Sequence, residues 1–331
     1  MNSPRTPRIL PWLASALALA ALPFTRAADL VPVTMQLDWK PNVQFAGLVV
    51  AVEKGYYREA GLDVRLRPVD TGMKVVEAVE AGTNWMGCSE SGVLIGARAR
   101  GARIKAVATM LQGSPFCLMS PKAKGIRTPA DLRGRTLGVH PDADLALDIV
   151  LKSAGVPRSS MRTIDVAHST EPLTSGQVDT LMGYLIDEVV ALETAGQALD
   201  VIRGYEHGYV AYSQVYFTSE QTLARSPEVV GKFLAASGRG WAEVARDPEA
   251  AVQLVLKRHL PKENPEYQRR SLREILVLAQ LEAGPGSFGR MSTETWRRMT
   301  GVFNDAKVLP RPVTAGEMLD LRFQPADARR P

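Results

Sequence analysis

The stretch LDWKPNVQFAG, residues 37 to 47, places an acid, an aromatic ring and an amide where an apolar run gives way to a helix-like run. Turn chemistry accounts for Pro41 and Asn42, but it does not account for Asp38 and Trp39. A tryptophan ring can stack on a flat ligand, and carboxylates and amides can hydrogen-bond its polar atoms. These residue types indicate a small-molecule site, with a plain core position as the alternative for Trp39.

Other polar residues follow the later predicted strands. They are Ser89, Glu90, Ser91, Gln112, His140, Asp142, His168, Tyr184 and Glu188. Open parallel sheets bind ligands at the carboxyl ends of their strands, so these residues are candidates for the same site. Each also has a structural explanation: the serines could cap a helix, the histidines could be ordinary loop residues, and Tyr184 and Glu188, four apart, could form a surface pair on one helix face.

No arrangement typical of catalysis accompanies these candidates. The chain has no G-x-S-x-G nucleophile turn and no glycine-rich phosphate loop. Its 4 histidines and 2 cysteines are scattered without metal-ligand spacing. We therefore expect a binding protein with no enzymatic activity, no metal and no cofactor.

The elements that must position these residues alternate between strand and helix. Runs such as LDVRLRPV and IKAVATML read as strands, and FAGLVVAVEKGYYREAG predicts one helix over 45–61, a pattern typical of an α/β fold with mainly parallel sheet. VVEAVEAGTNWMGCSES and EPLTSGQVDTLMGYLID share the order short helix, glycine turn, strand and polar helix start, which indicates two similar halves. From about residue 220 the pattern is helical, and we expect these helices to cover the sheets.

Residues 1–27 are typical of a secretory signal peptide, because Arg5 and Arg8 precede an apolar stretch of about 14 residues and small residues follow it. That stretch is shorter than a membrane-spanning helix requires. Cleavage near Ala27 and a periplasmic location are therefore expected. Loss of Arg5, Arg8 and Arg26 with the signal peptide lowers the net charge from +5 to +2, which does not favour nucleic acid as a partner.

The two cysteines are Cys88 and Cys117. An exported protein could join them in a disulfide, but the sequence does not reveal whether they approach within bridging distance. Buried free thiols are the favoured interpretation.

Four segments resemble the NMT1/THI5-like family, which comprises substrate-binding components of ABC transporters. They are LDWKPNVQFAGLVVAVEKGYYREAGLDV, AGTNWMGCSESGVLIGARARGARIKAVATMLQ, TPADLRGRTLGVH and SGQVDTLMGYLIDEVVALETAG. The resemblance implies a periplasmic binding protein of the second structural type, with two α/β lobes, a hinge and a ligand cleft between them. Lobe 1 would comprise residues 28–118 and 215–331, and lobe 2 residues 119–214.

The resemblance also implies ligands and roles. Well-known relatives bind thiamin pyrimidine precursors, and others bind riboflavin or sulfonates. Trp39 and Tyr184 would stack on a heteroaromatic ring, and Asn42 and Glu188 would bond its nitrogen atoms. The remaining expected site residues are Asp38, Phe45, Ser89, Glu90, Gln112 and His140. An inner-membrane ABC permease would be the partner of a monomeric binding protein.

Some positions depart from the family pattern. Phe45 replaces a histidine common in pyrimidine binders, and the loop VHPDAD adds Asp142 and Asp144, which disfavour an anionic ligand. Fungal members synthesise the thiamin pyrimidine with a lysine and a histidine, where this chain has Ser89 and Val93. We therefore predict capture of a neutral or cationic heteroaromatic molecule for import. Riboflavin, a sulfonate or another small solute as ligand, a sensor role, and the fungal type of enzyme remain alternatives.

Overall fold

The computed structural model describes Met1 and residues 30–70, 73–82, 85–140, 144–166, 169–280 and 288–324. The predicted signal peptide after Met1, Asp142, His168 and the side chain of Asp144 fall outside this part. The strands are β1 (Val31–Gln36), β2 (Leu62–Arg67), β3 (Trp85–Ser89), β4 (Ile104–Leu111), β5 (Phe116–Pro121), β6 (Thr136–Val139), β7 (Arg162–Asp165), β8 (Thr180–Tyr184), β9 (Leu199–Arg203) and β10 (Ser213–Ser219).

The helices lie between and after these strands. They are α1 (Ala46–Glu53), α2 (Tyr56–Glu59), α3 (Val75–Ala81), α4 (Ser91–Ala99), α5 (Asp144–Ser153), α6 (Glu171–Thr174), α7 (Val190–Thr194), α8 (Glu220–Arg225), α9 (Pro227–Arg246), α10 (Pro248–Arg258), α11 (Pro265–Ala279), α12 (Thr293–Asp305) and α13 (Ala315–Met318). Short 3-10 turns include η1 (Val43–Phe45) and η7 (Gly204–His207), and η6 (Leu185–Val189) is a π-helix.

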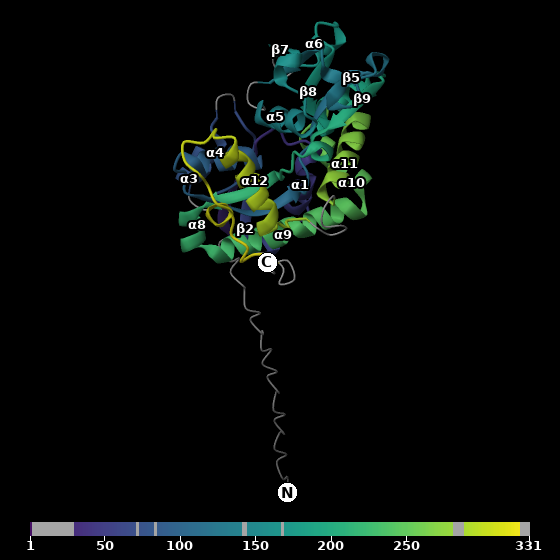
Figure 1. Cartoon of the computed structure of the whole chain (residues 1–331). Coiled ribbons are helices and arrows are strands. Elements are labelled where there is room, and N and C mark those ends of the chain that lie inside the picture. The colour runs from purple at the N-terminus through teal and green to yellow at the C-terminus, as the bar shows by residue number, and fades with distance from the viewer. Residues whose placement is uncertain are drawn as a thin grey trace.

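The described strands form two five-stranded sheets with the same plan. The first has the order β2-β1-β3-β10-β4 and the second β7-β6-β8-β5-β9, and they build the lower and upper lobes of Figure 1. In each sheet three successive strands take the second, the edge and the third positions in turn: β1, β2 and β3 in the first sheet, and β6, β7 and β8 in the second. This confirms the α/β fold and the prediction of two similar halves.

One strand in each sheet runs against its neighbours, and it is the strand by which the chain arrives from the other lobe. β5 is antiparallel to β8 and β9, and β10 is antiparallel to β3 and β4. The chain leaves β4 at residue 111 and enters β5 at residue 116. It returns between residues 203 and 213. An arriving strand starts at the edge where the parallel strands end, so its direction must be reversed.

The helix predicted over 45–61 is two helices, α1 and α2. The chain breaks between them at Gly55, whose φ of 77° lies in the left-handed region that favours glycine. The run of apolar residues continues through the break because both pieces face the same core, where Tyr57 is 1% exposed. The hydrophobic pattern therefore indicated correctly which residues are buried, but it did not reveal the break in the helix at Gly55.

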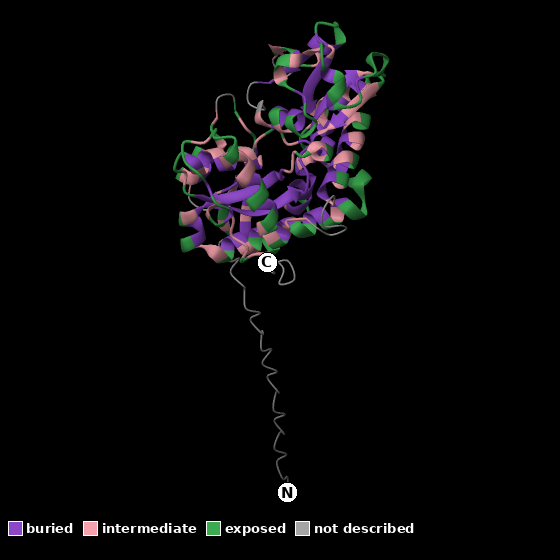
Figure 2. Cartoon of the chain, viewed as in Figure 1, coloured by how far each residue is buried: buried purple, intermediate pink, exposed green. Residues whose placement is uncertain are grey.

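Helices pack around both sheets, and buried residues concentrate on the strands and inner helix faces (Figure 2). α9 packs along α1, and Trp241 lies fully buried between them with its Nε1 donating to the Tyr216 hydroxyl at 3.2 Å. The edge strand β4 is capped by a parallel bridge between Ala106 and Leu319, which limits its exposed backbone groups. Among the described residues, no helix is both long and apolar enough to cross a membrane.

Close packing of α9 on α1 depends on Gly240. A Cβ there would come within 2.0 Å of the Gly47 carbonyl oxygen, so we expect Gly240→Ala to push the helices apart and cost about 1–3 kcal/mol of unfolding free energy. Chemical denaturation measures this. Gly238→Ala on the same helix is the matched control, because no heavy atom lies within 4 Å of its Cβ position and alanine favours helix. Equal stability of the two variants would contradict the packing argument.

Candidate functional site

The carboxyl ends of β1 and β3 lie side by side because these strands are parallel neighbours, with Gln36 opposite Gly87. Asp38 follows β1 and Glu90 follows β3. The antiparallel β10 starts at this same edge, since Val215 pairs with Ser89. The sheet thus gathers two acids that are 52 positions apart and the first residues of β10 into one cluster.

Ser213 and Gln214 of β10 connect this cluster. The Ser213 hydroxyl donates to the Glu90 carboxylate, the Gln214 side chain is hydrogen-bonded to Asp38, and the Cys88 thiol donates to the Gln214 Oε1 at 3.0 Å. Gln214 has a φ of 53°, a left-handed conformation that costs free energy in a residue with a side chain. Its bonds to Asp38 and Cys88 hold it there, at the point where the chain returns from the second sheet.

In the part of the chain that the structure describes, the two carboxyl groups of the cluster have no positively charged partner. Burial raises the pKa of Asp38 to about 7, against smaller lowering effects of its hydrogen bonds. Burial likewise raises the pKa of Glu90 to about 8, with the nearby Asp38 adding to the rise. Neither acid forms an ion pair with a lysine or arginine of the described chain, and the Asp38 Oδ1 is fully buried without a partner. Such a group gains from any N–H donor brought to it.

Trp39 stands next to Asp38 and is 41% exposed. It is not the core aromatic that the alternative interpretation supposed, and its ring is accessible at the same edge of the sheet. Asn42 is 4% exposed, and its Oδ1 accepts from the Gln44 backbone N–H at 2.9 Å, which caps η1. Phe45 is fully buried in the hydrophobic core under α1, so its side chain has no accessible surface.

Two of the predicted site residues in the first sheet are also buried. Ser89 lies within β3 and is 5% exposed. Gln112, at 3%, donates from its Nε2 to the Arg290 carbonyl at 3.0 Å, and its backbone N–H donates to the Leu278 carbonyl at 2.9 Å. Gln112 therefore fastens the first crossing between the sheets to α11 and to the segment before α12.

The predicted residues of the second sheet also share one edge. His140 follows β6 and Tyr184 is the last residue of β8, and these two strands are parallel neighbours. His140 is 3% exposed, and its Nδ1 lies 3.1 Å from the Val166 carbonyl oxygen. Tyr184 is half-buried, and the Glu188 Oε2 accepts from its backbone N–H at 2.8 Å. Glu188 is therefore engaged at the start of η6.

The two edges face each other because the link between the sheets is short. Leu111 of β4 pairs with Ser213, and after four residues Phe116 of β5 pairs with Tyr184. Tyr209, in the return crossing, is near enough for the Glu90 charge to add to the effect of burial in raising its pKa. The carboxyl edge of each sheet is thus turned toward the other.

Sequence reasoning did not find Ser213 and Gln214, because it searched only the ends of strands. Both residues lie at the beginning of a strand, and only its reversed direction brings them to the site. Cys88 and Cys117 are free and buried, in agreement with the favoured interpretation. No three metal-ligating side chains gather anywhere in the described ranges.

Comparison with known proteins gives consistent results. The sequence model described as NMT1/THI5 like matches residues 42–251. The formylaminopyrimidine-binding protein of Halalkalibacterium halodurans is 26% identical over 319 residues, covering 93% of this chain and 96% of that protein. The riboflavin-binding protein RibY of Chloroflexus aurantiacus is 27% identical over 304 residues, covering 88% of this chain and 86% of that protein.

An enzyme also occurs among the relatives. The 4-amino-5-hydroxymethyl-2-methylpyrimidine phosphate synthase of Legionella pneumophila is 26% identical over 245 residues, covering 72% of this chain and 77% of the enzyme. Among solved structures, the periplasmic aliphatic sulphonate binding protein SsuA from Escherichia coli superimposes with a TM-score of 0.70 at 15% identity, covering 88% of this chain and 92% of that chain. That similarity establishes the periplasmic binding protein fold.

Proposed function

Because the chain belongs to the NMT1/THI5-like family, we propose that it is the substrate-binding protein of an ABC importer and captures a small amino-bearing heteroaromatic molecule between its two lobes. The observation that carries this proposal is the pair of acids without a cation, Asp38 and Glu90, beside the exposed ring of Trp39. An exocyclic amine or protonated ring nitrogen would supply the missing donors, while the ring stacks on Trp39.

The same pair of acids disfavours a sulfonate. An anionic group brought to this edge would meet two carboxyl groups and no compensating lysine or arginine in the described part of the cluster. SsuA shares the fold, and a shared fold does not fix the ligand. Riboflavin stays an alternative because RibY is as similar in sequence as the pyrimidine-binding relative.

We propose lobe limits that follow the sheets, and they differ slightly from those expected from sequence. Residues 30–111 and 213–324 belong to the first lobe, and residues 116–203 to the second. The two crossings, 112–115 and 204–212, would act as the hinge. A ligand that contacts both lobes favours the closed form, and only a ligand with higher affinity for that form can shift the population.

The remaining assignments follow from this role. A binding protein of this kind acts in the periplasm as a monomer, after removal of residues 1–27, and delivers its ligand to an inner-membrane permease. A synthase is not proposed, since the positions of the fungal lysine and histidine hold Ser89 and Val93. Ser89 is buried within β3, and neither side chain has the chemistry of the residue it replaces.

A thermal-shift screen of the mature protein, refolded to remove carried ligand, tests the proposal. Hydroxymethyl- and formamidomethyl-aminopyrimidines are the first probes, followed by riboflavin and alkanesulfonates. At about 100 times Kd, the ligand should add roughly 2.7 kcal/mol of stability, an increase of several degrees in Tm. A response to riboflavin alone would show that riboflavin is the ligand and would leave the proposed importer role unchanged. A response to sulfonates alone would overturn the function assigned to Asp38 and Glu90.

A further inference from the structure

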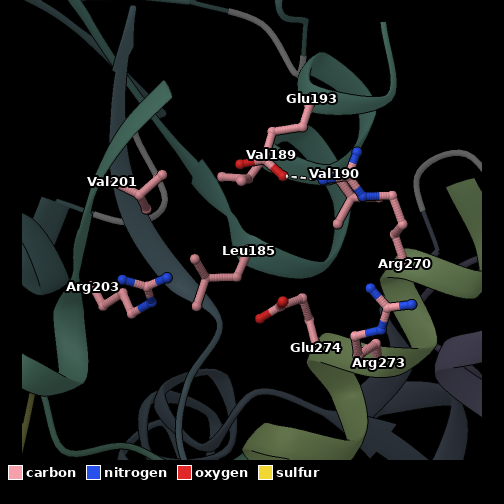
Figure 3. A pocket seen from close by; sticks show the side chains of 9 residues that line it. All are labelled: Leu185, Val189, Val190, Glu193, Val201, Arg203, Arg270, Arg273 and Glu274. Carbon is pink, nitrogen blue, oxygen red and sulfur yellow. Dashed lines mark hydrogen bonds and ion pairs between the residues drawn. The ribbon is translucent and has the colours of Figure 1, made fainter. Parts of the chain in front are cut away.

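A cavity of about 100 Å³ lies between α11 and the second lobe, and neither acid of the cluster, Asp38 or Glu90, lines it. Its walls come from η6, α7, β9 and α11, and none of the ten predicted site residues lines it. In Figure 3, Arg203 enters from β9, and Arg270, Arg273 and Glu274 project from α11 toward η6 and α7. The volume is enough for about three water molecules or one small ion.

The charges around this cavity do not balance. It is lined by the three arginines and by two glutamates, Glu193 and Glu274. Arg270 and Glu193 form an ion pair of 2.6 Å and neutralise each other. Within the described chain, the side chains of Arg203, Arg273 and Glu274 form no hydrogen bond or ion pair. Arg203, Arg273 and Glu274 together therefore leave one positive charge in excess.

We propose that this cavity binds a small oxyanion, a carboxylate or a phosphate, between Arg203 and Arg273. A guanidinium group presents a planar fork of donors that matches two oxygens of such an ion. A single negative charge would complete the neutralisation of the cavity. Glu274 limits the charge that can enter, because a second negative charge on the ion would be repelled by its carboxylate.

The bound ion would connect α11 to the second lobe. α11 already contacts that lobe through the Ser271 hydroxyl, which donates to the Ile186 carbonyl at 2.7 Å, and through the Tyr267 hydroxyl and Asp187. It contacts the first lobe through the Gln268 Oε1, which accepts from the Val43 backbone N–H at 3.2 Å. An ion shared by Arg203 and Arg273 would therefore strengthen a junction between the lobes, and it does so whatever the cleft binds.

Isothermal titration with inorganic phosphate at pH 6, and separately with acetate, tests the proposal on the mature protein without cleft ligand. Chloride at equal ionic strength provides the baseline. We expect saturable 1:1 binding of one or both oxyanions and none of chloride. Arg203→Gln should weaken that binding at least about tenfold, the loss of one charged hydrogen-bonded contact. Glu274→Gln should tighten it.

Arg269→Gln is the matched control, because Arg269 lies on the same helix but pairs with Glu249 outside the cavity. It should bind the oxyanion as the natural chain does. If Arg203→Gln fails to fold, Arg273→Gln is measured in its place. Arg273 is exposed, so its replacement should leave the fold unchanged. Binding no stronger than that of chloride, or an equal loss in the Arg269 variant, would overturn the proposal. The measurement uses no cleft ligand, so its failure leaves the proposed importer role untouched.

Discussion

Trp39→Ala is expected to weaken binding of the heteroaromatic ligand by about two orders of magnitude while leaving the fold intact. The ring supplies stacking area and apolar burial that alanine cannot replace, together worth roughly 2–3 kcal/mol. Trp39 is 41% exposed in the free protein, so alanine removes only part of a buried contact and should lower the unfolding free energy by about 1–2 kcal/mol, which leaves the protein folded. Titration calorimetry with the ligand from the thermal-shift screen measures the affinity, and urea denaturation measures the stability.

A matched aromatic control separates stacking from a general loss of aromatic surface. Tyr56 is partly exposed, with the Arg239 guanidinium 3.9 Å from its ring centroid. It lies shortly before β2, at the opposite end of the parallel strands from Trp39. Tyr56→Ala should therefore bind ligand with unchanged affinity. If Trp39→Ala binds equally well, the tryptophan does not belong to the site.

The protein without ligand should lose stability as the pH rises from about 5 to 8.5. Asp38 and Glu90 have pKa values of about 7 and 8 in the folded state, above the ordinary 3.8 and 4.5. The folded state therefore binds more protons than the unfolded chain, so these groups stabilise it fully below pH 4 and cease to do so as the pH passes 8. Each contributes on the order of a few kcal/mol. Urea denaturation across this range measures the slope.

Variants that cannot ionise identify the groups responsible. Asp38→Asn and Glu90→Gln should each flatten the dependence of unfolding free energy on pH, and the double variant should nearly abolish it between pH 5 and 8.5. Glu77→Gln, which changes an exposed glutamate on α3, should leave the slope unaltered. Unchanged slopes in both cluster variants would show that other groups determine the pH dependence.

Ligand binding should change the number of protons that Asp38 and Glu90 hold. A protonated amine or ring nitrogen placed against Asp38 and Glu90 favours their ionised forms, so binding of a cationic ligand should release protons. The charge that is costly in the empty site then becomes the feature that selects the ligand. This gives the buried acids a reason to persist at a position where they reduce stability at neutral pH.

The sequence by itself determined the class of fold and most of the local structure, with the break between α1 and α2 at Gly55 as an exception. The alternation of apolar and polar residues, at period two in strands and at about 3.6 in helices, depends only on residues close in sequence. Helix caps depend on the same short range, so they can be predicted from sequence. Asp247 accepts from the Ala250 backbone N–H at 3.0 Å and Asn264 from that of Glu266 at 2.8 Å, before the proline-started helices α10 and α11. The strand ends also placed Asp38, Trp39 and Glu90 at one edge, because parallel neighbours end together.

Only the tertiary structure decided which groups meet. Ser213 and Gln214 reach the acids because β10 runs antiparallel, and strand direction depends on the path of the chain between lobes. Phe45 looked like a site residue by position, but the turn of η1 directs it into the core. α11 looked like an outer covering helix, yet it contacts both lobes and lines a charged cavity. These contacts join residues far apart in sequence, and short-range periodicity carries no signal for them.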